Sequence, residues 1–265
     1  MIKIMPFLLL INTFVLGQDV PAKDISIADE LKKYTRAVWR GTEGDNLNYC
    51  YRGPDKIAPG KKYPLLFYLH GSGGRGNDNK GQLLDANGLE AFAEQEIFTK
   101  HSSYVFAGQV PKGERWVDVA WNALEHSMPP VSNFMELALE TLDAFVANKE
   151  HQVDPNRIYV MGLSMGGYGT WDAIQRRPQY FAAAVPICGG GDMALAPALV
   201  NMPIWIWHGD QDNSIKVSRS RDMAGAIKDA GGAPRYTEVQ GRSHNVWLDV
   251  WAAEELWLWL FGQSK

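Results

Sequence analysis

One pentapeptide, Gly162-Leu163-Ser164-Met165-Gly166, constrains the fold of this chain more than any other segment. The apolar run Ile158-Tyr159-Val160 precedes it, and a helical pattern over Met165–Arg177 follows it. A serine in a G-x-S-x-G segment between a strand and a helix occupies a tight, strained turn around which only small residues fit. A plain glycine-rich turn is the alternative, but it does not require this flanking context. We therefore predict that Ser164 is a nucleophile on a strand-to-helix turn.

Strands and helices alternate along the rest of the chain. Arg36–Arg40 and Leu47–Arg52 are expected to form opening antiparallel strands, and the continuous apolar run Tyr63–Leu69 predicts a strand that is buried on both faces. Further strands are expected at 103–107, 157–161, 182–187, 204–207 and 235–239, a turn at 154–156, and helices at 132–149, 165–177, 222–230 and 246–261. This order predicts one α/β domain with a mostly parallel central sheet flanked by helices.

A serine hydroxyl needs a base, because it is a weak nucleophile at neutral pH. Among the six histidines, only His244 lies late in the chain in a loop between a predicted strand and a predicted helix. The chain order Ser…Asp…His places the base there. The strand 204–207 ends in His208-Gly209-Asp210-Gln211-Asp212, so Asp212 or Asp210 is the acid that orients the base. The H-G-x-x-D arrangement favours Asp212, and His208 is then a structural residue at the strand end.

The tetrahedral oxyanion of such a reaction requires two backbone N–H groups. The residue after the nucleophile, Met165, supplies one, and the loop after the first parallel strand supplies the other. That loop is His70-Gly71-Ser72-Gly73-Gly74-Arg75-Gly76, whose glycines permit a close approach to substrate. We assign the second N–H to Ser72, with Gly73 as the alternative. A phosphate-binding loop is disfavoured, because the Lys-Ser/Thr pair of a Walker motif is missing.

The overall composition narrows the partners. The net charge is −4 and no long run of lysine or arginine occurs, so a nucleic-acid partner is not expected. The chain has no His-Glu-x-x-His segment and only two cysteines, so we expect no metal site and no cofactor. Cys50 and Cys188 would permit a single disulfide, which the sequence leaves open. Cys188 is expected to be packed structure rather than a second nucleophile.

The N-terminus resembles a targeting segment. Lys3 precedes a mostly apolar run over 4–16, and Val15 and Gly17 suit a signal peptidase. A buried strand or helix is the alternative. The run is shorter than the roughly 20 residues of a spanning helix, and no cysteine follows it, so no membrane anchor is expected. We predict a signal peptide at 1–17, a single catalytic domain at 18–265, and a secreted or periplasmic location.

These motifs together resemble the secreted carboxylesterases and predicted peptidases of the α/β-hydrolase superfamily. Those proteins are related to feruloyl esterases, polyhydroxybutyrate depolymerases, phospholipase/carboxylesterases and dienelactone hydrolases. The resemblance rests on the segments 69–76, 154–159, 162–171, 186–192, 208–212 and 241–244. It implies the α/β-hydrolase fold and acyl transfer to water without a cofactor. One departure is that dienelactone hydrolases use a cysteine nucleophile, whereas position 164 is serine.

The short connection between the strands at 182–187 and 204–207 leaves no room for a large lid domain. An open site favours small or polymer-linked esters, including those on plant polysaccharides. Trp116 and Trp121, in the loop 108–131, are candidate substrate contacts that could stack on a ring. A serine peptidase or amidase with the same triad is the alternative function, and a binding domain without catalysis is a third. The sequence does not determine the oligomeric state.

Overall fold

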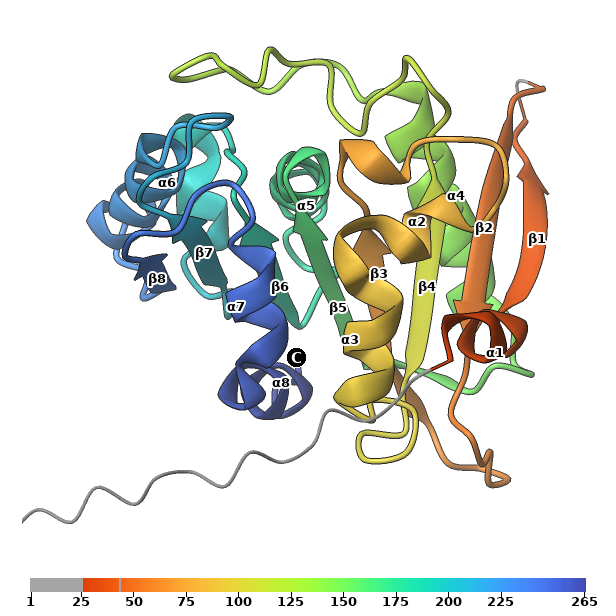
Figure 1. Cartoon of the computed structure of the whole chain (residues 1–265). Helices are drawn as coiled ribbons and strands as arrows, with labels where there is room; N and C mark the ends of the chain where they lie inside the picture. The colour runs from red at the N-terminus through yellow and green to blue at the C-terminus, as the bar shows by residue number, and fades with distance from the viewer. Residues whose placement is uncertain (1–25, 43) are drawn as a thin grey trace, which may run out of the picture.

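The computed structural model describes residues 26–42 and 44–265. Its centre is an eight-stranded sheet with the order β1-β2-β4-β3-β5-β6-β7-β8 (Figure 1). The strands from β3 to β8 run parallel, and β1 and β2 are antiparallel. The strands are β1 (Thr35–Arg40), β2 (Asn46–Arg52), β3 (Tyr63–Leu69), β4 (Tyr104–Gln109), β5 (Val153–Leu163), β6 (Ala183–Ile187), β7 (Trp205–Gly209) and β8 (Arg235–Val239). This sheet confirms the predicted α/β-hydrolase architecture.

Helices cover both faces of the sheet (Figure 1). The helices are α1 (Ile27–Lys32), α2 (Gly81–Leu84), α3 (Gly88–Glu94), α4 (Asn133–Ala147), α5 (Met165–Arg176), α6 (Ser218–Asp229), α7 (Trp247–Ala252) and α8 (Glu254–Phe261). Three short 3-10 helices are η1 (Ser72–Gly74), η2 (Asp85–Asn87) and η3 (Met193–Leu199). The connection between β6 and β7 contains only η3, so no lid domain is inserted there.

Two apolar clusters form the core, one on each face of the sheet. Side chains alternate between the faces of a strand, so Leu65, Phe67 and Leu69 of β3 join the cluster under α4, α5 and α6. Leu66 and Tyr68 join the cluster under α3, α7 and α8. Every residue of β3 is buried. The continuous apolar run of this strand therefore reflects a sheet that is covered on both sides.

Most predicted elements appear with small shifts of their ends. β3 and β8 have the predicted bounds, β1 and β2 pair antiparallel as expected, and Ser132 caps α4 by accepting a hydrogen bond from the Met135 N–H. The predicted turn at 154–156 lies within β5. There the register against β3 jumps from Val153 to Ile158, so the intervening residues bulge out of the ladder.

Two helices differ from the sequence prediction. α6 begins at Ser218 rather than at 222, because its first turn buries Arg219 and Ser220, polar residues that an apolar pattern does not reveal. The closing helix is not continuous over 246–261. It breaks at Ala253, whose φ of −80° and ψ of 86° are not helical, and α7 and α8 are separate helices.

Within the described residues, no helix is both long and apolar enough to cross a bilayer. The predicted signal peptide at 1–17 lies outside the described part of the chain. The two cysteines are described: Cys50 and Cys188 are both buried and both free, so they do not form a disulfide with each other.

Candidate active site

The turn at Ser164 is strained and tightly packed. Ser164 has a φ of 55° and a ψ of −116°, and the first residue of α5 follows it directly. Its N–H donates to the Ile187 carbonyl of β6 over 2.9 Å. The two motif glycines are needed for close approach. A Cβ on Gly162 would lie 2.3 Å from the Gly166 oxygen, and one on Gly166 would lie 1.9 Å from the Leu69 oxygen. The glycines of the motif therefore allow the start of α5 to pack directly against the backbone of β3.

This packing predicts a large stability loss for Gly166→Ala. The added methyl group would overlap a backbone oxygen that cannot move without displacing β3. We expect the free energy of unfolding to fall by about 3 kcal/mol, as measured by urea titration. Gly225→Ala is the matched control: Gly225 also lies within a helix, and a Cβ there would meet no atom within 4 Å. Equal stability of the two variants would show that the close approach at Gly166 is unimportant.

Ser164, His244 and Asp212 form one hydrogen-bonded chain. The Ser164 Oγ lies 2.9 Å from His244 Nε2, and His244 Nδ1 lies 2.7 Å from Asp212 Oδ2. The three residues come from the ends of β5, β7 and β8 or the loops that follow. The Ser164 residue is 8% exposed, and the side chains of His244 and Asp212 are 24% and 0% exposed. This is the geometry of a nucleophile, a base and an acid that orients the base.

The Asp212 carboxylate is held in its charged form. Burial alone would raise its pKa, but hydrogen bonds from His208, His244 and the Ile215 N–H outweigh burial and place the pKa of Asp212 well below its usual range. Its Oδ1 accepts from the N–H groups of Ser214 and Ile215 over 2.8 and 3.0 Å. Because Oδ2 faces His244, the base is held with its proton on Nδ1 and with Nε2 free to accept from Ser164.

The neighbouring candidates have other partners. The Asp210 Oδ1 accepts from the Gly241 N–H over 2.7 Å and thereby ties the β7 loop to the His244 loop. His208 is fully buried, as expected for a structural residue. Its Nδ1 lies 2.7 Å from the Ser220 Oγ, and its Nε2 lies 3.0 Å from the Ile215 oxygen and 3.2 Å from Asp212 Oδ2. His208 thus contacts the same carboxylate oxygen of Asp212 as His244 does.

The two predicted oxyanion donors lie in different segments, the loop after β3 and the start of α5. Ser72 opens the 3-10 helix η1 and is partly exposed, and Met165 is the first residue of α5. Among the hydrogen bonds of the described residues, neither the Ser72 N–H nor the Met165 N–H has a protein acceptor. Arg75 Nε donates to the Ser72 oxygen over 3.0 Å and fixes that peptide. Both N–H groups therefore stay candidates for the oxyanion donors.

The His70 ring holds this loop in place through two hydrogen bonds. Its Nε2 accepts from the Val110 N–H over 3.1 Å, so its Nδ1 carries the proton and donates to the Gly71 oxygen over 2.6 Å. A Cβ on Gly74 would lie 2.6 Å from this ring. Burial, together with the charge of Arg75, lowers the pKa of His70 to about 4. His70 is therefore neutral at pH 7 and is a positioning residue for the loop.

The lowered pKa of His70 predicts a loss of stability in mild acid. Between the ordinary value of 6.5 and about 4, the unfolded chain binds a proton that the folded chain does not, so stability falls as the pH falls. The contribution from His70 amounts to about 3 kcal/mol at pH 4. Urea titrations at pH 7, 5.5 and 4 should show a shallower pH slope in His70→Gln than in the wild type. Identical slopes would contradict this account.

The two tryptophans proposed as substrate contacts differ in their burial. Trp116 is fully buried, and its Nε1 donates to the His70 oxygen over 3.0 Å. The expectation for Trp116 is therefore wrong: its indole packs beneath the loop that carries Ser72, and it has no surface to offer a substrate. Trp121 is partly exposed. Its carbonyl accepts from the Tyr168 hydroxyl over 3.1 Å, which places it against the first turn of α5.

One group of described side chains converges closely enough to suggest a metal. Ligand atoms of Cys188, Asp212 and His244 lie within 4.8 Å of one another. Asp212 and His244 already share a hydrogen bond. Burial and the charge of Asp212 raise the pKa of Cys188 well above 9.0, which opposes the thiolate that a metal requires. These contacts fit a hydrogen-bonded acid–base pair better than a metal centre.

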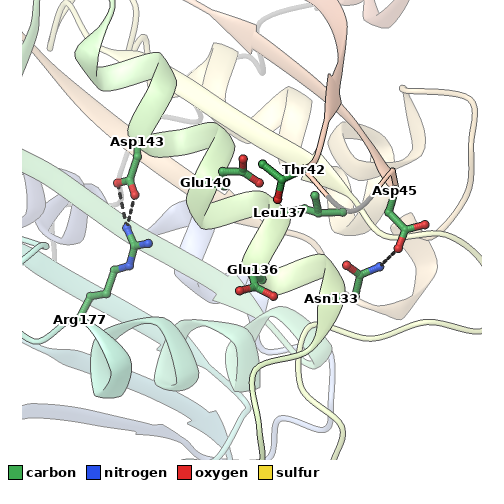
Figure 2. Close-up of a pocket in the computed structure, with 8 residues that line it drawn as sticks. All are labelled: Thr42, Asp45, Asn133, Glu136, Leu137, Glu140, Asp143 and Arg177. Atoms are coloured by element: carbon green, nitrogen blue, oxygen red, sulfur yellow. Dashed lines mark hydrogen bonds and ion pairs between the residues drawn. The ribbon is translucent and has the colours of Figure 1, made fainter.

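A separate hollow lies beside α4 (Figure 2). There Asp143 holds Arg177 through two hydrogen bonds, and Asn133 Nδ2 donates to Asp45 over 2.7 Å. The other lining residues are Thr42, Glu136, Leu137 and Glu140. None of Ser164, His244 and Asp212 lines this hollow, so it is distinct from the candidate active site.

Comparison with known proteins identifies the family of this chain. The sequence profile of the dienelactone hydrolase family matches residues 108–242, about half of the chain. The chain belongs to the dienelactone hydrolase family. The matched part of this α/β-hydrolase contains Ser164 and Asp212 and ends just before His244. The family resemblance predicted from the motifs is thereby confirmed, although the nucleophile position holds serine.

Individual relatives are similar over different lengths. A secreted protein of uncharacterised function from Arthroderma benhamiae is 24% identical over 72% of this chain and 22% of its own length. A poly(3-hydroxybutyrate) depolymerase from Ralstonia pickettii is 27% identical over 47% of this chain and 25% of its own. The crystal structure of a thermostable esterase has a TM-score of 0.78 and is 32% identical, over 88% of this chain and 64% of that one. The chain thus spans about a quarter of the two sequence relatives.

Sequence reasoning missed several residues that join the loop between β4 and α4 to α5 and α6. Arg219 is 2% exposed yet belongs to a polar segment, so no apolar pattern marked it. Tyr168 lies one turn after Ser164, a spacing that could have drawn attention to it. His126 was one of six histidines and had no motif around it. Their contacts become visible only once the loop between β4 and α4 is placed over α5.

Proposed function

We propose that this protein hydrolyses carboxylic esters through a Ser164–His244–Asp212 triad and an acyl-enzyme intermediate. The observation that carries the proposal is the continuous hydrogen-bonded chain from Ser164 Oγ through His244 to a buried, charged Asp212. The esterase structure and the depolymerase relative support ester substrates. Neither of these proteins is the same length as this chain, so the substrate class is part of the proposal.

The mechanism follows from the positions of the groups. His244 Nε2 removes the Ser164 proton as Oγ attacks the ester carbonyl, and the alcohol leaves after taking that proton from His244. The N–H groups of Met165 and Ser72 stabilise the oxyanion that forms in each tetrahedral intermediate. Water, deprotonated by His244, then releases the acid and restores Ser164. Asp212 stays charged throughout and stabilises the imidazolium.

The surroundings of the site support accessible substrates. The connection between β6 and β7 contains only η3, and Trp121 lies partly exposed beside α5. We propose small or polymer-linked esters as substrates, with Trp121 as a contact. The catalytic domain is proposed to span 18–265. A secreted relative supports the proposal that the protein acts in the periplasm or outside the cell, after removal of 1–17.

A panel of substrates tests this function. It holds p-nitrophenyl acetate, p-nitrophenyl octanoate, methyl ferulate, acetylated xylan, poly(3-hydroxybutyrate) and a peptide anilide. Hydrolysis of at least one ester class by the wild type, with no cleavage of the anilide, is the expected result. Cleavage of the anilide alone would assign the protein to the peptidases. No turnover and no labelling by a fluorophosphonate would favour a binding protein that has kept the fold.

A further inference from the structure

A buried arginine joins three segments at the edge of the candidate active site. Arg219 lies in the first turn of α6 and is 2% exposed. Its Nη1 donates to the Leu124 oxygen over 2.7 Å, and its Nη2 donates to the Gly191 oxygen over 3.1 Å and to His126 Nδ1. These three partners are neutral groups. The side chain ties the loop between β4 and α4 to the segment that follows β6.

This contact determines which nitrogen of His126 carries the proton. A guanidinium can only donate, so His126 Nδ1 must accept and the proton must lie on Nε2. Burial, together with the charge of Arg219, lowers the pKa of His126 to about 4, and Asp192 opposes this shift only in part. The ring is therefore neutral at pH 7, with a fixed N–H at Nε2.

The second ring nitrogen of His126, Nε2, is not used in a hydrogen bond among the described residues. His126 is partly exposed, and Nε2 has no acceptor among the described residues. Among the described residues, the buried side-chain atoms without a partner do not include His126 Nε2. This atom is therefore open to solvent. A purely structural histidine would need only the Nδ1 contact. Here the opposite nitrogen is held as a donor that solvent or a ligand can reach.

His126 packs beside Tyr168, which lies one turn of α5 after the nucleophile. Its ring centroid is 5.9 Å from that of Tyr168, whose N–H donates to the Ser164 oxygen over 3.1 Å. The Tyr168 hydroxyl donates to the Trp121 oxygen over 3.1 Å. The loop that carries Trp121 and His126 accordingly crosses above α5 in the direction of α6 (Figure 1).

The loop that carries Trp121 and His126 also lies close to the segment that carries Ser72 and Arg75. The Arg75 guanidinium lies 5.8 Å from the Trp121 ring centroid, and Arg75 Nε donates to the Ser72 oxygen. Trp121 therefore stands between the loop that carries Ser72 and the first turn of α5. Contacts therefore run from Arg75 through Trp121 and the buried Tyr168 to His126.

We propose that His126 Nε2–H is a specificity-determining hydrogen-bond donor in a subsite beside Ser164, and that Arg219 is its positioning residue. This subsite takes an ester with an acceptor oxygen, from a hydroxyl, ether or second carbonyl group, near the scissile bond. Such oxygens occur in hydroxyacyl polyesters and in sugar esters and are missing from simple alkyl esters. The inference rests on the proposed ester hydrolysis.

Two variants of His126 separate the donor from the loop anchor. In His126→Asn the side-chain oxygen replaces Nδ1 as acceptor for Arg219, and the outer donor is lost. In His126→Gln the amide nitrogen extends to the position of Nε2, and a donor is kept. His126→Asn should melt near the wild-type temperature, because it keeps an acceptor for Arg219 and adds no volume. His126→Gln should melt somewhat lower, because it loses this acceptor.

The measurement compares kcat/KM within matched ester pairs. p-Nitrophenyl 3-hydroxybutanoate against p-nitrophenyl butanoate tests the acyl side, and 2-hydroxyethyl butanoate against ethyl butanoate tests the alcohol side. We expect His126→Asn to lose about five- to tenfold on the oxygen-bearing member of one pair. The alkyl member should change less than about twofold, and His126→Gln should recover part of the preference. An unchanged ratio in both pairs, with active enzyme, would overturn the subsite. Wild type that hydrolyses none of these esters would instead contradict the proposed function.

Nitrogen-15 NMR of the imidazole rings gives a readout that does not depend on activity. We expect the His126 signals of the wild type to show the Nε2–H tautomer from pH 5 to 8 without titration. In Arg219→Gln, the pKa of His126 should rise toward its ordinary value. If this variant does not fold, the wild-type spectrum still decides. A proton on Nδ1, or titration near pH 6.5 in the wild type, would contradict the proposed role of Arg219.

Discussion

Replacement of Ser164 by alanine should lower kcat on any ester substrate by a factor of about 10⁴ to 10⁶. The reason is that the Oγ, 2.9 Å from His244 Nε2, is the only atom proposed to form the acyl bond. The residual rate would come from the oxyanion donors and from substrate binding. Steady-state kinetics with p-nitrophenyl acetate at pH 7.5 measures the effect.

The fold should survive this substitution. Alanine is no larger than serine, and the backbone bond from residue 164 to the Ile187 oxygen does not involve the side chain. Cys188→Ala is the matched control, because Cys188 lies close to Asp212 and His244 and its thiol is a second type of nucleophile. We expect Cys188→Ala to keep most of the wild-type turnover. Loss of activity in Cys188→Ala and not in Ser164→Ala would reverse the assignment.

The second large effect is expected for Asp212→Asn, with a loss of about 10⁴ in kcat. Asparagine keeps the shape of the side chain, but its amide can rotate to donate to His244 Nδ1. His244 would then carry its proton on Nε2 and could not accept from Ser164. Because residue 212 is buried and contacts His208, the replacement amide cannot turn toward solvent and stays against His244.

Asp210→Asn is the control for Asp212→Asn. Both carboxylates lie in the same loop, but Asp210 accepts from the Gly241 N–H and does not contact His244. We expect Asp210→Asn to lose less than about tenfold in kcat, through a small displacement of the His244 loop. The kinetics are measured as for Ser164→Ala, together with far-ultraviolet circular dichroism. Equal losses in the two variants would mean that loop structure, rather than charge on Asp212, explains the effect.

Much of this architecture can be predicted from local patterns. The apolar run of β3 and the cap at Ser132 follow from burial and hydrogen bonding within a few residues. The positions of Ser164, His244 and Asp212 follow from motifs with a fixed chain order, and the structure brings the three side chains together. The strand and the cap depend on residues that are close together in the sequence, and each triad residue lies in a short motif of its own.

The surroundings of the triad depend instead on contacts between distant segments. Trp116 and Trp121 occur in the same loop with similar sequence context, yet one is buried under His70 and the other is partly exposed beside Tyr168. The contact between Arg219 and His126 spans 93 positions. No periodicity or motif encodes such a pair, so this contact becomes visible only in the folded chain.

The most direct test of the central claim is to locate the acyl group during turnover. The protein is mixed with p-nitrophenyl acetate, quenched in acid before the steady state, digested and analysed by mass spectrometry. We predict an acetyl group on the peptide that contains Ser164, no such adduct in Ser164→Ala, and accumulation in a variant with slowed deacylation. Acetylation of Cys188, or full turnover with no acyl-enzyme at any time point, would contradict the proposed mechanism.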